Sequence, residues 1–167
     1  MKYDIVSLQL EHEDLVTLFS TALYGDSTFS HWVPEKFEAL KTQGEGDCIE
    51  DHYANVLMNG GYICIADMEA AGETEEDCDN NSDILKVEEY EEFNGFMGNT
   101  FVAPVYHLNL ERINQAITEI MAKKTTGKYS SGLQKSLMAV LDPDDGGDYY
   151  DAWNVLQYFI FGDVVYG

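Results

Sequence analysis

The chain has 167 residues, 45% of them hydrophobic and 13% aromatic, and its 31 Asp and Glu against 9 Lys and Arg give a net charge of −22. It is long enough for one hydrophobic core and too aromatic for a disordered acidic tail. The charge disfavours phosphate-binding and membrane-surface roles, which need basic patches. We therefore expect one domain over residues 1–167 whose partners are basic proteins or cations, without direct nucleic-acid or membrane contact.

The cysteines and the hydropathy pattern predict a cytoplasmic protein. Cys48, Cys64 and Cys78 are an odd number without a close-spaced pair, which disfavours a disulfide framework and favours a reducing compartment. The first residues show no apolar run followed by a small-residue cleavage site. No stretch approaches the roughly 18 consecutive apolar residues of a transmembrane helix.

Hydrophobic spacing predicts the elements of the first part of the chain. A helix is expected at about residues 11–24, where apolar residues recur at helical spacing behind an acidic first turn. A second helix is expected over 49–58, ended by Asn59-Gly60-Gly61. Residues 62–67 are apolar and rich in β-branched side chains, which predicts a strand.

The most unusual segment runs from residue 67 to residue 92. Twelve acids and one base, Lys86, give it a charge of −11, half of the chain's −22. The acids are Asp67, Glu69, Glu73, Glu75, Glu76, Asp77, Asp79, Asp83, Glu88, Glu89, Glu91 and Glu92. Such crowding raises the free energy of a compact state, so the segment either meets a positive partner or is a solvated loop. Residues 70–83 almost lack large apolar side chains and are expected to form an exposed loop or a hairpin arm, within an acidic insertion at about 70–99.

Strands are expected next at Ile84–Val87 and Thr100–Tyr106, and Pro104 should confine the second to a sheet edge or a strand end. A helix should begin after the N-cap Asn109 and end near Lys124. Shorter signals predict a helix over 133–141, a loop over 142–148 and a helix over 149–161, followed by apolar residues that pack against the body. The expected fold is α+β, with about four helices on a small, mainly antiparallel sheet and a long acidic loop or hairpin.

Four segments, which together make up about a third of the chain, show a similarity to known proteins. They are LVTLFSTALYG (15–25), HYANVLMNGGYICIADMEA (52–70), YHLNLERINQAI (106–117) and DAWNVLQYFIFGDVVYG (151–167). These segments resemble a family of small acidic proteins of tailed bacteriophages and prophages, and the FGDVVYG ending is the most specific of the four. The resemblance implies a phage or mobile-element origin and brings no catalytic residues with it. The acidic stretch 71–99 is longer here than expected for the family.

One cation motif lies inside the acidic segment. Asp77, Asp79, Asn81 and Glu88 match positions 1, 3, 5 and 12 of an EF-hand loop, whose oxygen atoms surround Ca²⁺. Ser82 stands where the sharp turn needs glycine, and partial matches arise easily by chance in so acidic a segment.

No motif predicts catalysis. Cys48 and His52 could share a helix face, but zinc needs two further ligands and none has a paired spacing. Asn59-Gly60-Gly61 precedes a strand, unlike a phosphate loop, and Ser130-Ser131-Gly132 lacks the context of a nucleophile elbow. Acids are so abundant that any chosen carboxylate pair is uninformative. We expect no enzymatic activity, no cofactor and no metal.

The charge leads to one main hypothesis. Duplex DNA carries one charge per ~1.7 Å of axis, and a protein that copies this density can occupy a basic DNA-binding groove. We expect a phage or mobile-element protein that binds and inhibits a host nucleic-acid-handling defence protein through the twelve acids, with Tyr90, Phe93 and Phe96 as anchors. Two alternatives stay open: a non-catalytic structural or accessory phage protein, as a monomer or a homodimer, whose charge serves solubility, and a calcium-binding module that uses the 77–88 loop.

Overall fold

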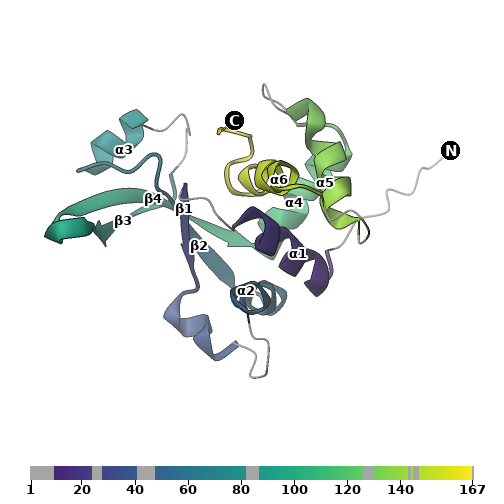
Figure 1. Ribbon diagram of the computed structural model, residues 1–167, viewed down its shortest axis with the longest axis horizontal. Coiled ribbons are helices and arrows are strands. Elements are labelled where there is room, and N and C mark those ends of the chain that lie inside the picture. The colour runs from purple at the N-terminus through teal and green to yellow at the C-terminus, as the bar shows by residue number, and fades with distance from the viewer. Residues whose placement is uncertain are drawn as a thin grey trace.

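In the part of the chain that the structure describes, four strands form an antiparallel sheet in the order β1-β2-β4-β3 (Figure 1). They are β1 (Phe29–Trp32), β2 (Tyr62–Asp67), β3 (Glu89–Asn94) and β4 (Thr100–Asn109). The computed structural model describes residues 10–23, 28–40, 48–81, 87–125, 130–142, 144 and 147–166. Consecutive strands β3 and β4 form a hairpin, while β2 and β4 pair although a helix and the strand β3 lie between them in the chain.

The described α-helices are α1 (His12–Ala22), α2 (Ile49–Met58), α3 (Glu75–Asn81), α4 (Leu110–Met121), α5 (Leu133–Leu141) and α6 (Tyr149–Phe161). Short 3₁₀ turns are η1 (Glu35–Leu40), η2 (Phe96–Gly98) and η3 (Ser130–Gly132). Figure 1 shows α1, α4, α5 and α6 grouped at one end of the molecule, whereas α3 lies apart from them beside the β3–β4 hairpin. None of the helices in these ranges combines the length and the apolar character needed to cross a bilayer. The fold is α+β, as predicted.

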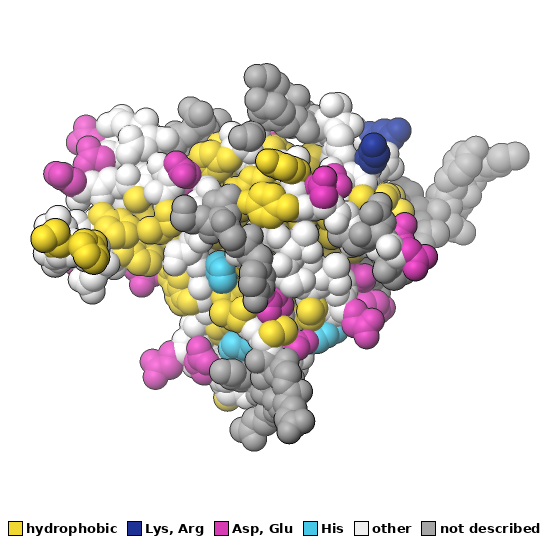
Figure 2. Space-filling view, viewed as in Figure 1, with side chains coloured by type: hydrophobic (Ala, Val, Ile, Leu, Met, Phe, Trp, Pro, Cys, Tyr) yellow, Lys and Arg dark blue, Asp and Glu magenta, His cyan; other side chains and the backbone are white. Residues whose placement is uncertain are grey.

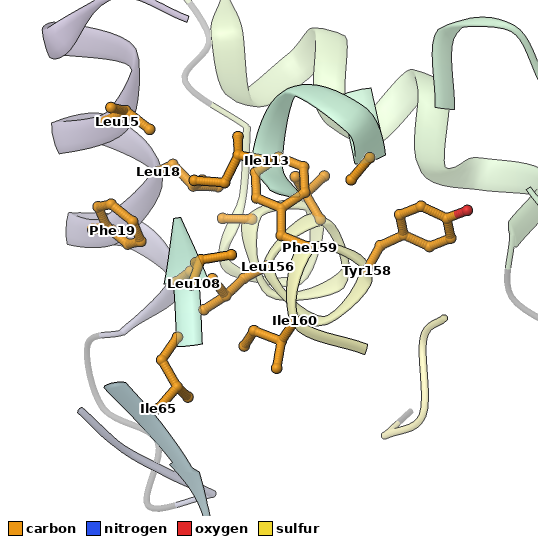
Figure 3. Close-up of a cluster of buried hydrophobic side chains, with 14 of the residues drawn as sticks. Leu15, Leu18, Phe19, Ile65, Leu108, Ile113, Leu156, Tyr158, Phe159 and Ile160 are labelled. Carbon is orange, nitrogen blue, oxygen red and sulfur yellow. The ribbon is translucent and has the colours of Figure 1, made fainter. Parts of the chain in front are cut away.

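The main core lies between the sheet and the grouped helices. Alternate side chains of a strand point to opposite faces. Ile63 is buried in this core, and Ile65 and Leu108 point into it (Figure 3). The helices contribute their apolar stripes, among them Leu15, Leu18, Phe19, Ile113, Leu156, Phe159 and Ile160. The helical spacing in the sequence therefore identified the buried faces.

On the opposite face of the sheet, small side chains lie beneath aromatic ones. Its buried centre consists of Cys64, Ala66, Ala103 and Val105. Trp32 of β1 and Phe93 of β3 come from strands at opposite edges of the sheet, yet their ring centroids are only 5.8 Å apart. Because the side chains between them are small, the two rings meet above the sheet and cover this second cluster.

Most predicted elements are confirmed. The elements α1, α2, β2, α4, α5 and α6 lie where helices and a strand were expected. The Asn109 side chain accepts a hydrogen bond from the Arg112 N–H at 2.8 Å, which is the predicted N-cap. The residues after α6 pack against the body: the buried Gln157 accepts the N–H groups of Val165 and Tyr166 and donates to the Tyr166 carbonyl.

Two predictions need correction, and one lies outside the described residues. Residues 70–83 were expected to form a loop or a hairpin arm, but Glu75–Asn81 form α3. The strand containing Pro104 is not an edge strand, because β4 pairs with both β2 and β3. Its register with β2 ends at Ala66↔Val105, and Val105 directly follows Pro104, so no recorded pair with β2 includes Pro104 or requires its missing N–H. For the strand expected at Ile84–Val87, only residue 87 is described, and it precedes β3.

Candidate functional site

The candidate site is the acidic lobe, defined as the described residues 68–81 and 87–103. It contains the turn before α3, α3 itself, β3, the hairpin tip and the first part of β4. It holds ten carboxylates and no Lys or Arg. These are Glu69, Glu73, Glu75, Glu76, Asp77, Asp79, Glu88, Glu89, Glu91 and Glu92. Figure 1 shows that the hairpin and α3 extend away from the grouped helices.

Local hydrogen bonds explain why α3 forms in so acidic a stretch. Asp77 accepts the N–H and the hydroxyl of Thr74, both at 2.9 Å, and the Thr74 hydroxyl accepts the Asp77 N–H at 3.2 Å. This reciprocal pairing is a capping box, and it satisfies backbone donors at the start of a helix. The buried Cys78 then fastens the helix to β4 through a hydrogen bond from its thiol to the Val102 carbonyl at 3.2 Å. Thr74-x-x-Asp77 is the sequence signal that could have predicted α3.

The turn before α3 is attached to β4 at Gly72. The Gly72 N–H donates to the Val102 carbonyl at 2.9 Å, and the Val102 N–H donates to the Gly72 carbonyl at 2.8 Å. A Cβ at position 72 would lie 2.4 Å from the Asp77 Cβ, far inside normal contact. Glycine is therefore needed here, because the capped start of α3 packs directly on this bridge.

Most carboxylates of the lobe are exposed, and their partners differ. Nine of the ten residues are exposed, and Asp77 is half-buried. Asp77 caps α3, and Asp79 accepts a hydrogen bond from the Tyr90 hydroxyl, which raises the pKa of Tyr90 to about 12. Six acids form neither a side-chain hydrogen bond nor an ion pair with any described residue: Glu69, Glu73, Glu75, Glu76, Glu91 and Glu92. These six are free to meet an external positive charge.

The acids do not share one face of the hairpin. Side chains alternate along β3, so Glu89, Glu91 and Phe93 lie on the face that carries the small-residue cluster. Tyr90 and Glu92 lie on the opposite face, the side where Tyr90 reaches Asp79 of α3. Figure 2 also shows Asp and Glu side chains at several other places on the face that it displays. The lobe is acidic on both sides, which differs from a single flat negative surface.

Glu88 has a structural partner that the sequence analysis missed. Arg112, the only arginine of the chain, forms an ion pair with Glu88 and also donates to the carbonyls of Ile160 and His107. The second oxygen of Glu88 accepts the His107 N–H at 2.7 Å. Arg112 thereby joins the start of β3 to β4 and to the end of α6. The sequence offered one signal for this ion pair, because a single arginine among 31 acidic residues is expected to pair with a carboxylate.

Asp67 lies in the interior, so its prediction as a partner-binding residue needs correction. It is fully buried at the end of β2, and its carboxylate accepts the N–H groups of Glu69 and Ala70 and the Tyr166 hydroxyl, the last at 2.6 Å. Burial raises the pKa of Asp67 above its usual value, and the hydrogen bond from Tyr166 partly opposes that shift. An external cleft cannot reach this carboxylate. Asp83 lies outside the described residues.

The tip of the hairpin exposes two large apolar side chains. Phe96 is 92% exposed and Met97 is 88% exposed. Met97 has φ 68° and ψ 21°, the left-handed conformation that costs a residue with a Cβ about 1–2 kcal/mol. Figure 2 shows hydrophobic side chains at this outer end of the hairpin. Exposed apolar groups held in a strained turn are a candidate contact point for another protein.

The geometry does not favour the calcium-loop alternative. Asp77, Asp79 and Asn81 lie on α3, where successive residues are rotated by about 100°, so residues two apart point to different sides. Glu88, at the closing position, pairs with Arg112. Within the described ranges, no group of three His, Cys, Asp or Glu side chains could hold a metal ion.

Cys48 and His52 do come together in a pocket at the start of α2. The pocket has a volume of about 270 Å³ and is also lined by His31 and Glu38. His52 is buried, its Nε2 lies 3.7 Å from the Glu38 carboxylate, and neither ring nitrogen has a hydrogen-bond partner among the described residues. The His31 ring is already engaged, with Nδ1 2.6 Å from the Tyr53 hydroxyl. We assign no chemistry to this pocket.

No family model matches the chain, and no curated protein or solved structure is significantly similar to it. The resemblance to small acidic phage proteins therefore stays a prediction.

Proposed function

We propose that this protein is a non-catalytic acidic protein of a phage or mobile element that binds a basic nucleic-acid-handling protein of its host and blocks the nucleic-acid site. The observation that carries the proposal is the acidic lobe. Ten carboxylates without a Lys or Arg gather there, and six of them have no partner among the described residues. Uncompensated like charges destabilise a compact protein, and a basic partner would remove that repulsion.

The lobe offers two kinds of contact. Its carboxylates attract a basic surface over a distance and speed association, an effect that weakens as salt screens the charges. Phe96 and Met97 at the tip supply apolar surface that a partner could bury. A buried aromatic ring typically dominates such an interface, and truncating it costs about 2 kcal/mol or more of binding free energy. We assign attraction to the carboxylates and anchoring to the tip.

The experiment is affinity capture from a nuclease-treated bacterial lysate with the tagged protein as bait. We expect a basic protein to be retained at low salt, lost at high salt and displaced by added duplex DNA. Replacing Glu73, Glu75 and Glu76 with Gln should weaken capture. The matched control replaces three exposed acids outside the lobe, Glu13, Glu35 and Glu111, by Gln and removes the same amount of negative charge.

The competing function is an accessory protein whose charge serves solubility. The acidic side chains on other parts of the surface favour this candidate (Figure 2). If both triple variants behave alike, or if DNA fails to displace the captured protein, nucleic-acid mimicry through the lobe is wrong. Loss of solubility in both variants, without loss of a specific partner, would support the accessory function.

A further inference from the structure

We propose that the outer edge of β3 binds an extended, basic segment of the partner as a fifth strand of the sheet. This inference rests on the proposed function and specifies the mode of binding. The strand β3 ends the order β1-β2-β4-β3, and no other described strand pairs with its outer side. A strand at a sheet edge presents unpaired backbone N–H and C=O groups to any extended chain.

The hydrogen bonds of β4 show which groups of β3 face outward. Val102 exchanges both of its backbone hydrogen bonds with Gly72, on the side of β4 away from β3. In an antiparallel ladder, the residue opposite Val102 then also directs its backbone N–H and C=O away from the neighbouring strand, and that residue is Glu92. Two positions earlier, Tyr90 is opposite Pro104, which has no N–H to offer. The backbone groups of Tyr90 and Glu92 therefore face the free edge, whereas those of Glu91 and Phe93 face β4.

The charges beside this edge select the occupant. Glu89 and Glu91 lie on one face of β3 and Glu92 lies on the other, so an added strand has carboxylates on both of its sides. Opposite charges on neighbouring strands stabilise the pairing, and like charges destabilise it. A second copy of this chain would place Glu opposite Glu. A segment rich in Lys or Arg places a cation beside each carboxylate instead.

The neighbouring aromatic side chains complete the surface. Phe93 stacks on Phe101 with ring centroids 5.6 Å apart, on the same face as Glu89 and Glu91. Six residues of β3 span roughly 20 Å, enough for an added strand of about six residues. Phe96 lies just past the end of this strand. A partner segment can therefore pair along β3 while an adjoining apolar surface covers the tip.

The probe is an acetylated and amidated nine-residue peptide of alternating lysine and threonine. The matched peptide has the same composition with alternating L and D residues, which keeps the charge and cannot continue a regular ladder. Glu92→Pro removes the outward N–H, and Glu92→Ala removes the carboxylate alone. We expect the L peptide to bind the wild type more tightly than the mixed peptide, and Glu92→Pro to weaken it by about fivefold relative to Glu92→Ala, the worth of one backbone hydrogen bond.

Amide hydrogen exchange on the unmodified protein gives a readout that needs no variant to fold. Saturation with the L peptide should slow exchange at Tyr90 and Glu92, while Glu91 and Phe93 are already protected by β4. Equal affinity for the two peptides, equal affinity of the two Glu92 variants, or binding without new protection at Tyr90 and Glu92 would overturn strand addition. The proposed function is tested independently by the capture experiment, and it is wrong if the variant with Gln at positions 73, 75 and 76 captures the partner as well as the wild type does.

Discussion

Met97→Gly should stabilise the folded protein and weaken partner binding at the same time. Met97 adopts φ 68°, which costs a residue with a Cβ about 1–2 kcal/mol. Glycine removes that cost but loses about 0.5–1 kcal/mol more backbone entropy on folding. The side chain is 88% exposed, so its removal forfeits little packing. The expected net gain is about 0.5–1 kcal/mol, or a rise in Tm of about 1–4 °C for a chain of this size.

The assay is urea unfolding followed by circular dichroism, with Met97→Ala as the matched control. Alanine removes the same side chain but keeps the Cβ, so it should leave the free energy of unfolding within about 0.5 kcal/mol of the wild type. Both variants should lose affinity for the captured partner to a similar extent, because both delete the exposed apolar group. If Met97→Gly is no more stable than Met97→Ala, the tip is not strained. If neither variant weakens capture, the tip is not an anchor.

Three further predictions concern the parts that position the lobe. Gly72→Ala should lower the free energy of unfolding by about 1–3 kcal/mol, measured in urea, because its Cβ would lie 2.4 Å from the Asp77 Cβ. Arg112→Met should cost about 1–3 kcal/mol because it leaves one Glu88 oxygen and the carbonyls of His107 and Ile160 without the Arg112 donor, and adding Glu88→Gln should recover part of the loss in a double-mutant cycle. Burial raises the pKa of Asp67 in the folded protein above its value in the unfolded chain, so the folded state binds the Asp67 proton more tightly. This tighter binding stabilises the folded state fully at pH values below the unfolded pKa, and the stabilisation is lost as pH rises through the folded pKa. Asp67→Asn should remove this dependence, so the stability of the wild type relative to the variant should fall as pH rises from about 4, in urea titrations at several pH values. A constant difference between the two proteins would contradict the pKa shift.

The resemblance to phage proteins and the acidic lobe rest on different parts of the chain. The resemblance rests on segments that build the core and the tail, such as residues 106–117 and 151–167. The acidic lobe lies mostly outside those segments. Loops and insertions generally vary more among homologues than the core does, so we expect the proposed interaction surface to vary more than the core.

The sequence by itself determined the elements whose signal is local. Apolar residues at helical spacing located α1, α4 and α6, β-branched residues located β2, and Asn109 marked the start of α4. The high density of acids between residues 67 and 92 was also evident from the sequence alone. These features depend on neighbours a few residues away, so the sequence carries them in full. The capping box of α3 is local too, but without an apolar stripe it does not stand out among the acids.

Only the tertiary structure decided what each acid does. Asp67 is buried because Tyr166, 99 residues later in the chain, packs against it and donates to its carboxylate. Glu88 is engaged because Arg112 of α4 reaches it, while Glu91 and Glu92 stay without a described partner. Pro104 is tolerated in a central strand because the pairing of β4 with β2 ends at Val105, so the N–H that proline lacks is not needed for that pairing. Burial, pairing and register each depend on contacts between distant segments, and a one-dimensional pattern of charge does not contain those contacts.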